Sequence, residues 1–281
     1  MKPKKYASLA KRYTEQPFNE IFAYFPFNPE NEETWETPYE HLARIAKVED
    51  WHFNRPEFKA KYRQQFPILT NYLNYTFLRA QELNLISYSI DGDKACFNTG
   101  LQTKEEKDIF ALFFKNKEAT KYKAPDWTLY TFVDSYSTKL NPYKPLPDLP
   151  TYIKDPADLV FDTNLDLEIN TEHIIEQNKE RLPPVLQTNR RLAMTALNGS
   201  IESLKSKVLR NYKVAIPHWY ENKMQLLLPL NLTDDNNADV ALVIDKDKQR
   251  NIYRATTILT MDLAYIDARL ITRPDREWLN P

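Results

Sequence analysis

Apolar residues along this chain recur first at a helical spacing and then at an extended spacing, and this sequence of patterns occurs twice. A helical spacing runs from Pro56 or Pro67 to Leu83, and another runs from about residue 185 to 210 after Pro183-Pro184. Short aliphatic and aromatic runs follow each helical segment and predict strands. The sequence therefore predicts an α+β fold in which antiparallel sheets pack against long helices.

Local signals mark the ends of several elements. Thr37, Pro38 and Glu40 have the spacing of a capping box with proline at the first helical position, which predicts a helix over 38–46. Asp91-Gly92 lies between two apolar runs and predicts a hairpin turn. Asn170-Thr171 predicts a helix that ends near residue 181. The strand predictions are 85–90, 94–98, 108–114, 127–133, 212–216, 224–230, 238–244 and 251–256. Strand 108–114 has an alternative, because Thr103 and Glu106 also fit a helix capping box.

The two halves of the chain resemble each other. Lys94–Leu101 followed by Asp108 matches Gln225–Leu232 followed by Asp239, and a long predicted helix lies upstream of each pair. We interpret this as a helix-plus-meander unit used twice, at an offset near 131 residues. The alternative is chance similarity between two ordinary meanders. The two repeats are expected at about 55–140 and 183–281, with a stiff proline-rich connector over 142–150.

The expected organisation is an N-terminal arm over 1–37 and a single compact domain over 38–281.

The composition excludes several kinds of ligand site in that domain. Three glycines in 281 residues exclude the glycine-rich phosphate loops of Rossmann, P-loop and kinase folds. One cysteine and four scattered histidines give no sequence-local metal cluster, although a magnesium site made of carboxylates stays open. No cofactor is indicated.

The net charge is −1, so nucleic-acid binding would need a local basic patch. The polar N-terminus lacks the apolar core of a signal peptide, and no apolar run approaches eighteen residues. We therefore expect a cytoplasmic protein with no membrane partner. Its oligomeric state is not readable from the sequence.

The last predicted helix, over about 257–272, carries polar residues in an apolar setting. Asp262, Tyr265 and Arg269 lie at i, i+3 and i+7 and therefore share one face. Charges within a buried element cost several kcal/mol unless they are paired. This stripe is the candidate catalytic site, and a purely architectural Asp262–Arg269 pair is the alternative. Asp134, after a strand end, is the candidate second carboxylate beside Asp262.

Four blocks resemble the DUF3825 family of bacterial domains of unknown function. They are Cys96-Phe-Asn-Thr-Gly-Leu101, Asn211-Tyr-Lys213-Val-Ala-Ile-Pro217, Gln225-Leu-Leu-Leu-Pro-Leu230, and Thr257 to Leu270 followed by Arg273-Pro-Asp-x-Glu-Trp278-Leu. The resemblance extends from about Pro38 to Leu279. It implies no assigned activity, but family members resemble modules joined to small RNA-binding domains, which points toward RNA.

The remaining candidates are ligand-binding residues. Asn98 precedes Gly100 and is expected either to present its amide to a ligand or to cap a turn. Arg190, Arg191 and Lys213 belong to the most basic segment, which is expected either to bind phosphates or to form an ordinary solvated surface. His218 is a ligand-binding candidate because it lies at a predicted hairpin tip, where core packing explains less.

These residues support three hypotheses of function. The first is a module that interacts with single-stranded RNA or nucleotides. The second is a hydrolase of phosphodiester or nucleotide bonds, with Asp262 as base or metal ligand and Arg269 stabilising transition-state charge. The third is a protein-interaction scaffold in which the Asp262–Arg269 stripe is architectural. The sequence does not decide between an enzyme and a binding protein.

Overall fold

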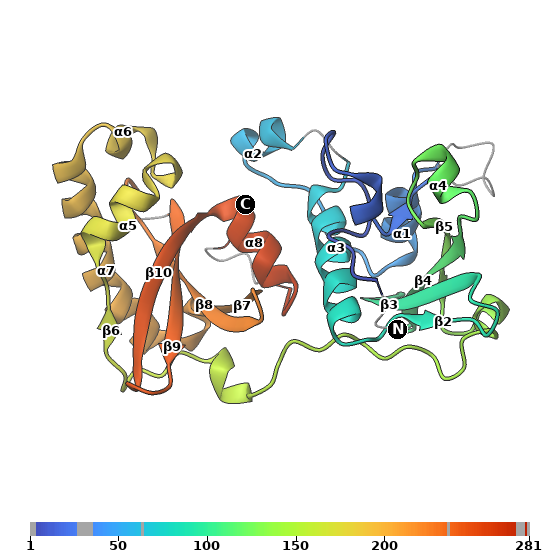
Figure 1. Ribbon diagram of the computed structural model, residues 1–281. Helices are drawn as coiled ribbons and strands as arrows, with labels where there is room; N and C mark the ends of the chain where they lie inside the picture. The colour runs from blue at the N-terminus through green and yellow to red at the C-terminus, as the bar shows by residue number, and fades with distance from the viewer. Residues whose placement is uncertain (1–3, 27–35, 63–64, 235–236, 274–278, 280–281) are drawn as a thin grey trace. The chain divides into compact units, whose positions relative to one another are not determined.

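The computed structural model describes residues 4–26, 36–62, 65–234, 237–273 and 279, and the chain divides into two compact units (Figure 1). Unit 1 comprises Met1–His52 and Tyr62–Thr151, and unit 2 comprises Phe53–Lys61 and Tyr152–Pro281. Each unit contains one five-stranded, mostly antiparallel sheet with its own helices. The predicted α+β class is confirmed.

Unit 1 has the strand order β1-β5-β4-β3-β2, in which β1 pairs with β5 in parallel and the other pairs are antiparallel. Its elements are β1 (Ala23–Tyr24), α1 (Pro38–Ile45), α3 (Pro67–Glu82), β2 (Ser87–Tyr88), β3 (Lys94–Gln102), β4 (Asp108–Lys115), α4 (Ala119–Tyr122) and β5 (Trp127–Asp134). Short 3-10 turns lie at Phe18–Glu20 and Thr138–Leu140.

Unit 2 has the order β6-β10-β9-β8-β7, again with one parallel pair, β6 with β10. Its elements are α2 (Pro56–Lys61), β6 (Leu167–Glu168), α5 (Thr171–Gln177), α6 (Pro184–Gln187), α7 (Arg190–Arg210), β7 (Ile216–Tyr220), β8 (Lys223–Leu230), β9 (Val240–Asp247), β10 (Ile252–Thr260) and α8 (Met261–Arg269). Further 3-10 turns lie at Pro156–Leu159, Lys179–Arg181 and Tyr212–Val214.

The two sheets have the same connectivity, which supports the predicted duplication. Cys96 pairs with Leu112 in one sheet as Leu227 pairs with Val243 in the other, an offset of 131 residues in both strands. The repeated pattern begins earlier than residues 55 and 183. A two-residue parallel strand and a short helix come first in each copy, β1 with α1 and β6 with α5.

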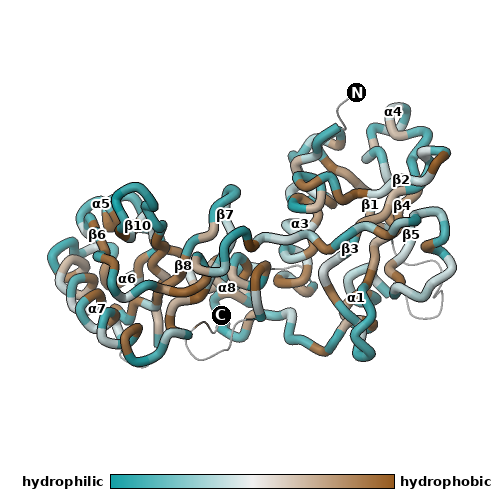
Figure 2. The backbone as a smooth tube through the Cα atoms, turned by 90° about the horizontal axis from the view of Figure 1, so that it is seen from below, coloured by the Kyte–Doolittle hydropathy of each residue, from teal (hydrophilic) through white to brown (hydrophobic). Residues whose placement is uncertain are grey.

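Both faces of each sheet are covered. In unit 2, α7 covers the face of Leu226, Leu228 and Leu242, and α8 packs beside β7, β9 and β10 (Figure 1). In unit 1, α3 contacts β3, and the opposite face is covered by Leu140, at the end of the 3-10 turn, and by Tyr143 of the connector, which pack on Cys96. The apolar stretches of the chain accordingly follow the strands and their covering elements (Figure 2).

Several local expectations are confirmed. Thr37 and Glu40 form the capping box at the start of α1, and β2 pairs with β3 around the Asp91-Gly92 turn. By contrast, the range predicted as an N-terminal arm is part of unit 1, to which it supplies β1 and the buried side chains of Leu9 and Phe22. None of the helices in the described part of the chain is long and apolar enough to cross a membrane.

Three boundaries differ from the predictions. The terminal helix begins at Met261 and not at Thr257, because residues 257–260 pair with β9 and extend β10. The long helix over 185–210 is divided, because the side chain of Asn189 accepts from Leu192 N and caps a new helix, α7. The strand predicted over 212–216 is a 3-10 turn, and β7 begins only at Ile216.

Gly100 lies at the irregularity between β3 and β4, with a φ of 74° that favours glycine. A Cβ at this position would lie 2.5 Å from the Tyr72 hydroxyl oxygen. We expect Gly100→Ala to lower the free energy of unfolding by about 1–3 kcal/mol, because it adds both backbone strain and a clash.

Gly199 is the matched control, since it lies within α7 and a Cβ there would meet nothing within 4 Å. Gly199→Ala should raise the stability by about 0.5–1 kcal/mol through helix propensity. Urea unfolding of both variants measures the two changes. Equal effects of the two substitutions would contradict the role assigned to Gly100.

Candidate functional site

The stripe on α8 is buried, and its carboxylate is bound by a lysine from the first half of the chain. Asp262 and Tyr265 are 0% and 1% exposed. Lys61 Nζ, at the end of α2, donates to Asp262 Oδ2 at 2.6 Å. The Lys61 side chain is half exposed, so it reaches the buried carboxylate from the surface. In this arrangement Lys61 compensates the charge of Asp262, and Oδ2 is not available to a substrate.

A second buried ionisable pair joins α8 to β7. His218 is 1% exposed, and its Nδ1 lies 3.8 Å from Asp267 Oδ2. Neither ring nitrogen has a hydrogen-bond partner among the described residues. Burial lowers the pKa of His218 to about 4 and raises the pKa of Asp267 to about 7. Between about pH 4 and 7 the pair is therefore neutral, with its proton on the carboxyl group.

His218 also begins a row of polar side chains across sheet 2. It is opposite Gln225 on β8, whose Nε2 donates to Asp245 Oδ1 on β9 at 2.5 Å. Asp245 is opposite Arg254 on β10, and Arg254 is opposite Glu168 on β6. Arg254 Nε donates to Glu168 Oε2 at 3.3 Å. The row runs from a buried end at His218 to an exposed end at Glu168.

The basic segment is neutralised at one end. Arg190 Nη2, at the start of α7, lies 2.9 Å from Glu176 and 3.7 Å from Glu172. Arg191 is exposed beside it. Lys213 is exposed at the other end of α7, a 21-residue helix and hence about 30 Å away. One ligand group therefore cannot contact all three cations.

The other two predicted residues belong to unit 1. Asn98 is 3% exposed, accepts from Gly100 N at 2.9 Å and donates to Asp108 at 3.2 Å, so its amide is engaged in the local turn. Asp134, at the end of β5, accepts from Tyr136 N at 2.8 Å. The catalytic candidates Asp262, Tyr265 and Arg269 all lie in unit 2.

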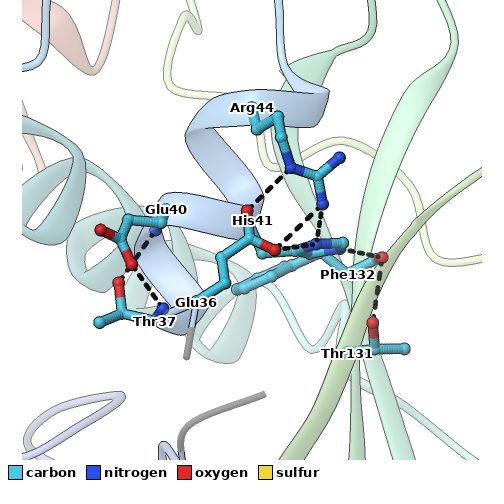
Figure 3. A network of polar contacts seen from close by, with 7 residues as sticks. All are labelled: Glu36, Thr37, Glu40, His41, Arg44, Thr131 and Phe132. Atoms are coloured by element: carbon cyan, nitrogen blue, oxygen red, sulfur yellow. Dashed lines mark hydrogen bonds and ion pairs between the residues drawn. The ribbon is translucent and has the colours of Figure 1, made fainter. Parts of the chain in front are cut away.

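Unit 1 holds a charged network that the sequence analysis did not identify (Figure 3). Arg44 binds both oxygens of Glu36, at 2.8 and 3.0 Å, and lies 3.0 Å from His41 Nδ1. His41 Nε2 lies 3.2 Å from Phe132 O, which can only accept, so the proton is on Nε2. The hydrogen bond from Arg44 holds the pKa of Glu36 below its usual value.

This network borders an open hollow of about 620 Å³, with Trp51 and Phe66 on its apolar side. Glu36, Glu40 and Glu49 face it with Arg44 as the compensating cation. The hydrogen bond from Thr37 N lowers the pKa of Glu40, so this carboxylate stays ionised at neutral pH. The anionic lining makes the hollow unsuitable for phosphate groups. Among the described residues, no three His, Cys, Asp or Glu side chains are grouped to hold a metal ion.

Sequence reasoning missed Lys61 and Asp267. Lys61 lies 201 residues from Asp262, and no local pattern links the two. The available signal was physical: a carboxylate in a buried helix needs a cation, and that cation can come from anywhere in the chain. Asp267 falls within the same apolar helix and could have been found by the same argument.

A family model described as a domain of unknown function, DUF3825, matches residues 42–278. The matched range includes all nine residues proposed from the sequence. Its last part, residues 274–278, lies outside the described residues. No curated protein and no solved structure matches the chain.

Replacing Lys61 tests whether it holds the Asp262 carboxylate. We expect Lys61→Met to lower the free energy of unfolding by about 2 kcal/mol or more, because it leaves a charge in a buried position. Lys59→Met, on the same short helix and exposed, is the control and should change stability by less than about 0.5 kcal/mol.

A double-mutant cycle with Asp262→Asn measures the coupling between the two side chains in urea unfolding. Lys61→Met should cost much less in the Asp262→Asn background, because no buried charge remains. Additive effects of the two substitutions would show that the ion pair is not stabilising.

The His218–Asp267 pair should make the pH dependence of stability sensitive to single substitutions. Folding raises the pKa of Asp267 from 3.8 to about 7, so this group favours the folded state at low pH and loses that effect between about pH 4 and 7. Folding lowers the pKa of His218 from 6.5 to about 4, so this group destabilises the folded state as pH falls through that range. The two contributions nearly cancel in the wild-type protein.

We therefore expect the stability of His218→Gln to fall as pH rises from 4 to 7, and the stability of Asp267→Asn to rise from pH 4 to 6.5. Each slope is limited to about 1.4 kcal/mol per pH unit, the value for one proton. Urea unfolding at several pH values, compared with wild type, measures the slopes. Parallel profiles for all three proteins would contradict this assignment.

Proposed function

This chain belongs to the DUF3825 family, and from that premise we propose that it binds single-stranded RNA or nucleotides through phosphate contacts at the C-terminal end of α7. The family description assigns no activity, so the proposal depends on the geometry of this end of the helix. The observation that carries it is an exposed tyrosine, Tyr212, placed between two exposed cations, Arg210 and Lys213.

The last turn of α7 carries the cations Lys207 and Arg210. The Arg210 guanidinium donates to the carbonyl and hydroxyl oxygens of Ser206, one turn back on its own helix. Lys207 Nζ donates to Asn231 Oδ1 at 2.8 Å, which is a neutral partner. Phosphate oxygens are strong acceptors for such groups, and arginine binds them in a bidentate manner.

Tyr212 supplies the second element of a single-strand site. Its side chain is 65% exposed, so its ring is available to stack on a base or to contact a ribose. Proteins that bind single strands combine a positive surface with aromatic side chains in this way. The N-terminal end of α7 lacks this combination, because Glu172 and Glu176 neutralise Arg190.

The test is fluorescence anisotropy of a labelled oligoadenylate of about twelve nucleotides, titrated between about 50 and 200 mM salt. We expect Arg210→Ala/Lys213→Ala to weaken binding roughly tenfold at low salt and to reduce the slope of log K against log salt by about 2. Arg190→Ala is the control from the other end of the helix, and it should weaken binding less than about twofold because its charge is already compensated.

Binding that is absent at low salt would exclude the proposed function. Equal losses for the Arg190 variant and the double variant would show that the contact is not at the C-terminal end of α7. Release of labelled fragments during the titration would favour the hydrolase hypothesis over simple binding.

A further inference from the structure

One end of sheet 1 carries a row of exposed aromatic side chains on a single face. Tyr24 on β1 is opposite Thr128 on β5, Thr128 is opposite Phe114 on β4, and Phe114 is opposite Lys94 on β3. Residues opposite each other in adjacent strands project from the same face of the sheet. Tyr24 is 54% exposed and Phe114 is 41% exposed, although both lie within strands.

The row continues into a pair of rings tilted relative to each other, with a lysine over one of them. The ring of Tyr130 lies 4.6 Å from the ring of Phe114, and Lys139 Nζ lies 4.7 Å from the Tyr130 ring centroid. Tyr130 also packs against the buried cluster of Cys96, Phe110 and Leu112. Leu140 and Tyr143, from the segment that follows β5, cover that cluster. Tyr24 and Phe114, farther toward the end of the strands, remain exposed.

The equivalent row of unit 2 has a different chemistry. Through the offset of 131 residues, Lys94 and Phe114 correspond to Gln225 and Asp245. Thr128, opposite Phe114 on the next strand, corresponds to Arg254, and Tyr24, opposite Thr128, corresponds to Glu168. Charged and amide side chains that bind one another occupy this row in unit 2, whereas unit 1 exposes aromatic rings. Since the scaffold is the same, the fold itself does not require aromatic rings at these positions.

We propose that the aromatic row of unit 1, Tyr24, Phe114 and Tyr130, is a stacking platform for unpaired bases of single-stranded RNA. Bases stack on exposed aromatic rings of a sheet regardless of their identity, because every base has a π-face. Tyr24 and Phe114 are two strands apart and therefore about 10 Å apart across the sheet, which allows more than one base to bind.

The charges near the row suit a polyanion. Lys94 lies within it, and Lys139 lies over Tyr130. The acidic residues beside the strand ends are compensated, because Asp93 pairs with Lys117 at 2.6 Å and Asp126 pairs with Lys4 at 2.5 Å. The local surface thus offers cations to the phosphates that accompany the stacked bases.

This inference rests on the proposed function, and the salt dependence of binding distinguishes the two. Stacking contributes affinity with little salt dependence, whereas phosphate contacts set the salt slope. We expect Phe114→Ala and Tyr24→Ala each to weaken binding of the labelled oligoadenylate about tenfold with an unchanged salt slope. Phe114→Tyr should bind as wild type, because it keeps the ring.

Tyr13→Ala is the matched control, since Tyr13 is 61% exposed in the same unit but lies outside the row. An abasic ribose-phosphate oligomer of equal length should bind the wild-type protein and Phe114→Ala equally. Circular dichroism checks that each variant is folded.

The outcomes separate the two proposals. Normal binding by Phe114→Ala and Tyr24→Ala, with losses only in Arg210→Ala/Lys213→Ala, overturns the platform and leaves the proposed function intact. Losses for Tyr13→Ala equal to those for Phe114→Ala also overturn the platform. Failure of the wild-type protein to bind the oligomer at low salt overturns both.

Discussion

Each sheet of this protein is apolar on both faces, and the requirement to cover both faces organises the rest of the structure. In β8 and β9, buried aliphatic residues occupy consecutive positions, so alternate side chains point to opposite sides and each side needs a partner. A long helix, α3 or α7, covers one side in each unit. The second cover differs between the units: a proline-rich segment in unit 1 and the helix α8 in unit 2.

The segment that covers the second face of each sheet, proline-rich in unit 1 and α8 in unit 2, differs in the side chains that it brings to that face. In unit 1 the cover packs Leu140 and Tyr143 on the sheet and places Lys139 over Tyr130, and aromatic rings of the same face are exposed at the strand ends. In unit 2 the cover carries Asp262 and Asp267, which need compensating groups. The same face thus carries different side chains in the two similar sheet units.

Much of the fold follows from local sequence signals. The capping box at Thr37, the turn at Asp91-Gly92 and the apolar runs of β3, β4, β8 and β9 are each encoded within a few residues. The parallel strands β1 and β6 were missed because each has only two residues, too few to show a period. The start of α8 was placed too early because Thr257–Thr260 suits a helix as well as a strand, and pairing with β9 decides the outcome.

The candidate site was less predictable than the fold, for a physical reason. A charge in an apolar helix signals that a partner exists, but the identity of the partner depends on tertiary contacts. The sequence suggested Arg269 for Asp262, and the structure shows Lys61 as a partner, from the short segment Phe53–Lys61, which belongs to unit 2 although it precedes α3.

The buried charges also bear on where function resides. Burying Asp262 and His218 is costly, and the structure limits that cost with the Lys61 ion pair at Asp262 and with a neutral imidazole at His218. These contacts join α8 to α2 and to β7. Groups that meet an external ligand must instead be exposed in the folded chain, as Tyr212, Arg210, Tyr24 and Phe114 are. Asp262, which the sequence singled out, is therefore bound within the chain by Lys61, whereas the surfaces for which we propose RNA binding are exposed.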